Sequence, residues 1–158
     1  MEHLEAVILQ FLCQQNTHNI RDAEASLRSS LSAKGGMGHL VSLLCSSTHE
    51  VVRQTAGILL RRQIVALWGR KNASGRVELQ RLLLGRLAGE PSRLVRKAVI
   101  GCVSSLGKAT LSGAGWPELF ELLVLASTNN SEEVRELGQL LAWELAESCG
   151  GTYRVYNF

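Results

Sequence analysis

The sequence has few helix-breaking prolines, few of the aromatic residues typical of strands and little net charge. It holds 2 prolines in 158 residues and 5% aromatic residues. Its long segments consist of Leu, Ala, Val, Arg and Glu, and not of the β-branched and aromatic runs typical of strands. The formal net charge is only +3, whereas domains that bind phosphate backbones concentrate basic charge more strongly. We therefore predict an all-α protein and expect no nucleic-acid partner.

Metal-binding and catalytic patterns are also missing. The histidines are scattered and no C-x-x-C pair occurs, so no spacing suits a metal. Serine pairs fall within predicted helices with no histidine in register, which leaves nucleophilic catalysis without support. The sequence predicts no enzyme, no metal and no cofactor. We interpret the four cysteines as buried free thiols in a reducing compartment, namely Cys13, Cys45, Cys102 and Cys149.

The first residues, MEHLEAVILQFLC, do not have the features of a signal peptide. They are apolar but carry Glu2 and Glu5, and they lack a basic start and a small-residue cleavage site. They are also far shorter than a bilayer-spanning helix. We expect no targeting to secretion or to a membrane.

One short phrase recurs four times along the chain, as NIRDAEASL, VVRQTAGILL, LVRKAVIGCV and EVRELGQLL. In each phrase an arginine follows an aliphatic residue, and a small residue comes two or three positions later. The arginines are Arg21, Arg53, Arg96 and Arg135. Their spacing is close to the period of about 40 residues that two-helix repeats show. A degenerate helical repeat is therefore predicted.

Each phrase opens an amphipathic segment, and a second apolar segment precedes it. The clearest buried stripe runs through Val52, Ala56, Leu60 and Ile64. The preceding apolar segments are 4–12, 40–45, 77–87 and 116–126. The pattern predicts about four helix pairs, each with a helix A followed by a helix B that begins at the repeated phrase. We expect residues 1–149 to stack into a right-handed superhelix rather than a closed bundle, and 150–158 to form a divergent tail.

A candidate binding ridge lies on the B helix expected over 51–71. Arg53, Gly57 and Arg61 fall four residues apart, opposite the apolar stripe, with Gln54 and Arg62 beside them. These residues are predicted to share an exposed ridge that could bind carboxylates and carbonyls of a partner. The alternative is that the arginines are solvated or bond within the array.

Other prominent residues are interpreted as structural. Arg96 and Arg135 directly follow the aliphatic residue that opens a B helix, so we expect them to hold the array together. Trp68, Trp116 and Trp143 are expected to pack in the core or at its edge. Without a capping repeat, the last helix pair is expected to expose an apolar face and to promote self-association.

Over residues 4–147 the chain resembles the N-terminal HEAT repeats of the importin-β (karyopherin-β) family. The most specific segments are R-Q-x-A-x-x-L-L-R-R-x-I-x-x-x-W, which ends at Trp68, and the W-P-E-L start of a helix A at Trp116. The resemblance implies a HEAT-repeat right-handed α-solenoid. Because full receptors are far longer, we interpret the chain as a truncated member.

The resemblance also implies a function. N-terminal repeats of this family bind the GTP form of the small GTPase Ran through their B helices, in protein import into the nucleus, so the chain is expected in cytoplasm and nucleus. Arg61 sits where family members contact Ran, and the other expected Ran contacts are Arg21, Arg53, Gln54 and Arg62. Cargo proteins and nucleoporins are expected partners only of a full-length receptor. The alternative is a helical scaffold, or a truncated isoform that binds neither Ran nor cargo.

Overall fold

The computed structural model describes residues 2–13, 17–33, 35–111, 113 and 115–150, and all regular structure within them is helical. The all-α prediction is confirmed. In chain order the helices are α1 (Glu2–Leu12), α2 (Thr17–Ser32), α3 (Gly36–Ser46), α4 (Glu50–Arg61), α5 (Ile64–Gly69), α6 (Ala73–Gly89), α7 (Arg93–Leu111), α8 (Pro117–Ser127) and α9 (Glu132–Gly150).

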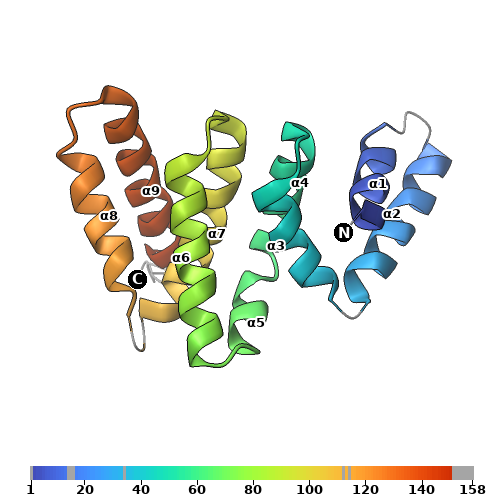
Figure 1. Cartoon of the computed structure of the whole chain (residues 1–158), viewed down its shortest axis with the longest axis horizontal. Coiled ribbons are helices and arrows are strands. Elements are labelled where there is room, and N and C mark those ends of the chain that lie inside the picture. The colour runs from blue at the N-terminus through green and yellow to red at the C-terminus, as the bar shows by residue number, and fades with distance from the viewer. Residues whose placement is uncertain (1, 14–16, 34, 112, 114, 151–158) are drawn as a thin grey trace, which may run out of the picture.

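The helices are arranged as neighbouring pairs in a row. Within pairs, α1 packs on α2, α3 on α4, α6 on α7 and α8 on α9. Figure 1 shows the row running from α1 and α2 at one end to α8 and α9 at the other. These pairs correspond to the A and B helices expected from the repeated phrase. The pairs are held to each other mainly by direct contact of α4 with α7 and of α7 with α9.

The core is a layer of aliphatic side chains that continues from pair to pair. Removing one such side chain from water stabilises the fold by about 1.5 to 3 kcal/mol. Because no single helix pair covers its own apolar stripe, stacking is what buries these residues. Residues with 0–1% exposure occur in all pairs, and they include Ile8, Leu40, Leu44, Val52, Leu60, Leu83, Ile100, Leu106 and Leu119.

The helix expected over 51–71 is broken, so its predicted continuity is wrong. α4 ends at Arg61 and α5 begins at Ile64. Between them, Gln63 leaves the helical conformation with φ −125° and ψ 0°, and its N–H donates to the Leu60 carbonyl at 2.9 Å. The turn redirects the chain so that α5 contacts α6 and α7, with Ile64 fully buried. The hydrophobic stripe remains buried, although one straight helix does not carry it.

The cysteine prediction is correct in that no disulfide forms but only partly correct for burial. None of the four cysteines, all of which the structure describes, is in a disulfide, yet Cys13 is exposed, Cys45 and Cys149 are half-buried, and only Cys102 is buried. The hydrophobic character of cysteine is therefore not sufficient to predict whether it is buried. Burial depends on the position along the helix, and Cys13 directly follows the last residue of α1.

The three tryptophans differ in their surroundings. Trp116 is 1% exposed and packs in the core, as expected. Trp68 is half-buried at the core edge, and the Arg76 guanidinium lies 4.2 Å from its ring centroid, a cation–π contact. Trp143 is 58% exposed, so the packing expected for it is wrong. Trp143 lies in α9, the last of the described helices.

An apolar surface is exposed on the last helix pair, in agreement with the sequence analysis. Phe120, Val124 and Leu125 of α8 are 49%, 63% and 66% exposed. Phe120 and Val124 are four residues apart and share one side of α8, and Leu125 lies next to Val124 about a quarter of a turn further round the helix. Large exposed apolar groups of this kind favour association with another apolar surface.

We therefore expect the purified chain to self-associate as its concentration rises. The variant Val124→Glu/Leu125→Glu should shift the sedimentation profile toward monomer, because it places two like charges within the exposed apolar surface of α8. The matched control is Val51→Glu/Val65→Glu, which makes the same two changes at apolar residues of α4 and α5 that are each 43% exposed. Equal association of the two variants would show that α8 is not the contact surface.

Two further features concern the described residues alone. None of their helices combines the length and the hydrophobicity needed to cross a bilayer. No group of three or more His, Cys, Asp or Glu side chains among them could hold a metal ion. The expected divergent tail, including Tyr153 and Phe158, lies outside the described residues apart from Gly150, which ends α9.

Candidate protein-binding surface

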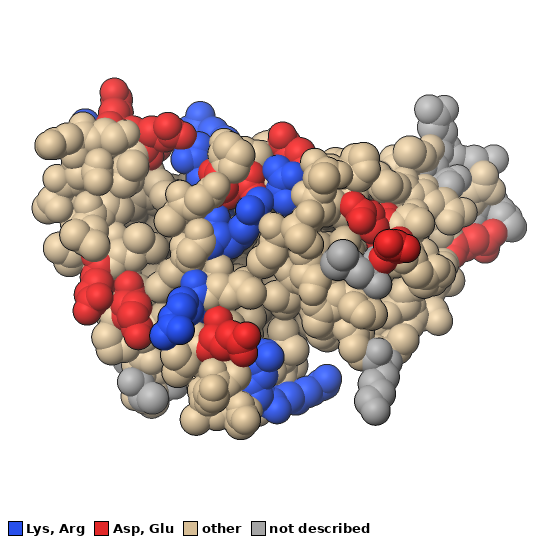
Figure 2. Space-filling model, viewed as in Figure 1, with Lys and Arg blue, Asp and Glu red and all other residues tan. Residues whose placement is uncertain are grey.

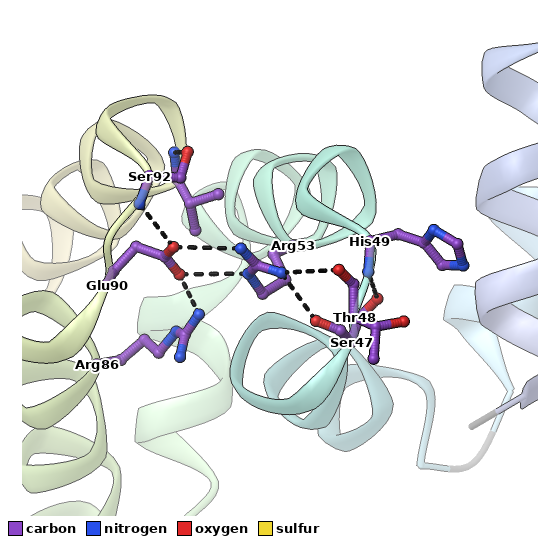
Figure 3. Close-up of polar contacts among 8 residues, drawn as sticks. Ser47, Thr48, His49, Arg53, Arg86, Glu90 and Ser92 are labelled. Carbon is purple, nitrogen blue, oxygen red and sulfur yellow. Dashed lines mark hydrogen bonds and ion pairs between the residues drawn. The ribbon is translucent and has the colours of Figure 1, made fainter.

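Arg53 lies at the junction between two helix pairs and not on an exposed ridge (Figure 3). Only 12% of its side chain is exposed. Its Nε and Nη2 donate to the two carboxylate oxygens of Glu90 at 3.3 Å, and its Nη1 donates to the carbonyls of Ser47 at 3.0 Å and Thr48 at 3.3 Å. The prediction of an exposed Arg53 is wrong, because the planar guanidinium satisfies several acceptors at once inside the array.

Glu90 is the centre of this network. Its side chain is 0% exposed, and it also accepts hydrogen bonds from Arg86 of α6 and, at 3.0 Å, from the N–H of Ser92. Burial by itself raises the pKa of Glu90, but the Ser92 N–H, the Arg53 hydrogen bond and the charges of Arg86 and Arg53 together hold it below its ordinary value. The carboxylate therefore stays ionised and joins α4 to the following helix pair.

The repeated arginine of the last phrase makes the same local contacts. Nη1 of Arg135 donates to the carbonyls of Asn129 at 2.8 Å and Asn130 at 2.9 Å. These carbonyls precede the arginine by six and five residues, the offsets at which Arg53 binds its own loop carbonyls. The arginine of the phrase thus closes the loop between helix A and helix B in both pairs.

The repeated arginines also connect consecutive pairs. Arg96 donates to the Glu133 carboxylate at 2.5 Å, and the two residues are 37 positions apart. Arg53 and Glu90 are separated by the same 37 positions. The structural role predicted for Arg96 and Arg135 is confirmed, and it extends to Arg53.

The middle of the expected ridge is a helix–helix contact. Gly57 is buried, and a Cβ atom at this position would lie 2.8 Å from the Cβ of Ala98 in α7. The Cys102 thiol donates to the Gly57 carbonyl at 3.2 Å, and burial raises its pKa to about 12, although the Arg61 charge acts in the opposite direction. The close approach of α4 and α7 therefore depends on the absence of a side chain at residue 57.

The part of the ridge that stays accessible is a shallow depression between α4 and α7. It has a volume of about 210 Å³ and is lined by Gln54, Ile58 and Arg61 from α4 and by Leu94, Lys97 and Ala98 from α7. Ile58 and Leu94 are 48% and 55% exposed. Two exposed aliphatic side chains with basic and amide groups around them suit a protein surface that carries both apolar and acidic residues.

Arg61 makes contacts within the chain that leave part of its guanidinium group accessible. Its side chain is 48% exposed, and its Nη2 lies 3.5 Å from the Glu144 carboxylate of α9. The stem crosses Gly101 so closely that a Cβ atom there would lie 2.9 Å from Arg61 Cδ. Glu144 is 14% exposed, but this one long contact involves only Nη2 of a half-exposed guanidinium, so Arg61 can still bind another carboxylate.

The other predicted residues lie elsewhere. Arg62 is exposed at the turn between α4 and α5 and lines a different groove, which also contains residues of α2. Arg21 is exposed on α2. The structure therefore brings Gln54 and Arg61 together and separates them from Arg62.

The predicted site did not include Ile58, Leu94 and Lys97, which also line this depression. A signal for Ile58 was present, because this aliphatic residue does not belong to the stripe of Val52, Ala56 and Leu60. Lys97 could not be found in this way, because its position next to α4 depends on packing between residues far apart in sequence.

The surface charge in this view is mixed. Figure 2 shows Lys and Arg side chains over the middle of the face, with acidic side chains beside them and toward both ends. Alternation of this kind suits protein contacts better than binding of a phosphate backbone, which requires a continuous basic track.

Comparison with known proteins finds similarity to importins. No family model matches the chain. Curated relatives include probable importin subunit beta-4 of Schizosaccharomyces pombe, 26% identical, and the importin-4 proteins of mouse and human, 28% and 30% identical, each over 134 residues. The matches cover 84–85% of this chain but only 12–13% of each relative. The chain thus spans about an eighth of the length of these relatives.

The fold and the surface define an all-α protein of stacked helix pairs, in which an inter-helix depression presents mixed apolar and basic groups. The matches show what this protein is related to. The chain is similar to these importins, which indicates a relation to the importin-β family.

Proposed function

We propose that the chain is a HEAT-repeat, right-handed α-solenoid segment that binds the GTP form of Ran in protein import into the nucleus. The relation to importins supports the family function, and the arrangement of helix pairs supports the solenoid. Cytoplasm and nucleus are the corresponding locations. Cargo proteins and nucleoporins are proposed as partners of a longer receptor that contains this segment.

One observation carries the assignment of the surface. Gln54 and Arg61, expected at the Ran contact from the resemblance, lie together in the depression between α4 and α7 with the exposed Ile58 and Leu94. In our proposal Arg61 and Lys97 bind acidic groups of Ran, and the two aliphatic side chains pack against its apolar residues. Arg53 contributes indirectly, because it holds α4 against the next pair.

The test is to measure binding of the purified chain to Ran loaded with a nonhydrolysable GTP analogue and, in parallel, to Ran-GDP. We expect selective binding of the GTP form. The charge reversal Arg61→Glu/Lys97→Glu should weaken it by about 10-fold or more, since unfavourable charges then face the acidic partner. Circular dichroism checks that the variant is still folded.

The matched control is Arg81→Glu/Lys108→Glu, which makes the same change in net charge at exposed residues outside the depression. It should retain binding. Equal affinity for the two nucleotide states, or no binding by the folded chain, would support the alternative of a scaffold or an isoform without Ran binding. Equal loss in both variants would refute the assigned surface.

A further inference from the structure

The first helix pair is attached differently from the others. The second helices α4, α7 and α9 pack directly on one another, whereas α2 makes its main contacts with α1 and α3. At the position where α2 would pack on α4, the structure has a groove of about 720 Å³. This volume is in the range of about 300 to 1,000 Å³ typical of pockets that bury a ligand.

The groove has an apolar lining contributed by both helix pairs. Leu27 and Leu31 come from α2, Met37 from α3, and Leu59 and Leu67 from α4 and α5. Leu27 is buried, and the other four are half-buried against the core. A partner that covers them would remove further apolar surface from water, and this favours an apolar face on the occupant.

The charged groups of the groove are mostly basic. Arg28, Arg62 and Arg70 line it, and the one acidic residue among its described lining residues is Glu24. Glu24 accepts a hydrogen bond from Arg28 at 3.0 Å, in a pair whose two side chains are 55% and 77% exposed. Arg62 and Arg70 flank α5, so two further guanidinium groups lie on the α4–α5 side of the groove.

We propose that the groove between α2 and α4–α5 binds an acidic amphipathic helix of a partner protein. The apolar face of that helix packs on the leucines, and its carboxylates bind Arg62 and Arg70. The bound helix would fill the space between α2 and α4. In the later pairs, the second helices contact each other directly at the corresponding position, as α4 does with α7. This site is separate from the proposed Ran surface, because Arg62 and Arg70 do not line the depression that contains Arg61.

The chemistry of the lining favours a helix over other occupants. A nucleic acid would not use an apolar floor of aliphatic side chains, and a basic peptide would be repelled by the arginines. A helix with apolar residues at i, i+3, i+4 and i+7 presents an apolar face to the aliphatic lining and can carry carboxylates beside that face, near Arg62 and Arg70.

The probe is a fluorescent synthetic peptide of about 16 residues with Leu at i, i+3, i+4 and i+7 and Glu on the flanking positions. Fluorescence anisotropy measures its binding to the full chain. Peptides of the same apolar pattern with Gln or Lys in place of Glu are compared with it. We expect the Glu peptide to bind at least about 10-fold more tightly than the Gln peptide, and the Lys peptide to bind least.

Two variants locate the site. Arg62→Glu/Arg70→Glu reverses the charge of the rim. Gly38→Trp fills the groove, since Gly38 lines it and a Cβ atom there would meet nothing within 4 Å. Each should weaken binding of the Glu peptide by about 10-fold or more. The controls Arg81→Glu/Lys108→Glu and Arg61→Glu/Lys97→Glu should leave it unchanged.

Equal binding of the three peptides would overturn the acidic character of the occupant. Binding that survives both Gly38→Trp and Arg62→Glu/Arg70→Glu in folded protein would overturn the location. A short single-stranded RNA is tested in parallel, and tighter binding of RNA that is lost in the same variants would replace the helix with a nucleic acid. Failure of Ran binding leaves these readouts unaffected, so the two proposals are tested separately.

Discussion

Replacing Glu90 with alanine is expected to lower the free energy of unfolding by about 3 to 5 kcal/mol. The carboxylate is 0% exposed and accepts from Arg53, Arg86 and the Ser92 N–H. Its removal leaves two guanidinium groups of only 12% and 20% exposure without their counter-charge. Urea unfolding followed by circular dichroism measures the loss.

The matched control is Glu78→Ala, which removes an exposed carboxylate from α6, the helix that Glu90 directly follows. It should change the free energy of unfolding by no more than about 0.5 kcal/mol. In a double-mutant cycle, removing Arg53 from the Glu90→Ala protein should cost less than removing it from the wild type, because its main partner is already gone. Additive losses would mean that the two side chains do not interact.

The contribution of Glu90 should also depend on pH in a defined direction. Its pKa in the folded chain is lowered, so the unfolded chain takes up the proton first as the pH falls. The stabilisation is therefore complete above the unfolded pKa of about 4.3 and is lost as the pH falls through the lower folded value. The stability difference between wild type and Glu90→Gln should be constant from neutral pH to about pH 5 and shrink below about pH 4. A difference that does not change with pH would exclude an ionised Glu90.

Substitution of Gly57 by alanine should destabilise the chain by about 1 to 3 kcal/mol, although alanine is the better helix former. The new Cβ atom would lie 2.8 Å from Ala98 Cβ and 3.4 Å from Leu44 Cδ1, so α4 and α7 must move apart. Their contact is the most extensive between any two described helices. Thermal and urea unfolding measure the change.

Gly85→Ala is the matched control, since Gly85 lies within α6 and its Cβ position has no neighbour within 4 Å. Here the helix preference acts alone, and we expect a gain of about 0.5 to 1 kcal/mol. Opposite signs for the two substitutions would establish that close packing, and not helix propensity, requires glycine at residue 57. A gain at both positions would contradict the close contact of α4 with α7.

The repeated phrase was enough to predict most of the fold. Arg53, Arg96 and Arg135 each open a helix B, and the apolar segments before them form the A helices, so local pattern was enough to predict the pairs. The break at Gln63 was not predictable, because Arg62, Gln63 and Ile64 include no helix-breaking residue. It arises where α5 turns to contact α6 and α7.

The binding surface was harder to predict than the fold, because it also depends on contacts between residues far apart in the sequence. Helical periodicity places Arg53 and Arg61 on the row of residues next to the apolar stripe, one position after Val52 and Leu60, but it does not show what faces them. Packing of the next pair covers Arg53 with a carboxylate 37 residues away and leaves Arg61 48% exposed. The sequence by itself determined which residues are helical and which are apolar. Which polar residues remain on the surface was decided only by tertiary contacts, because burial of a polar group depends on a partner that local sequence does not specify.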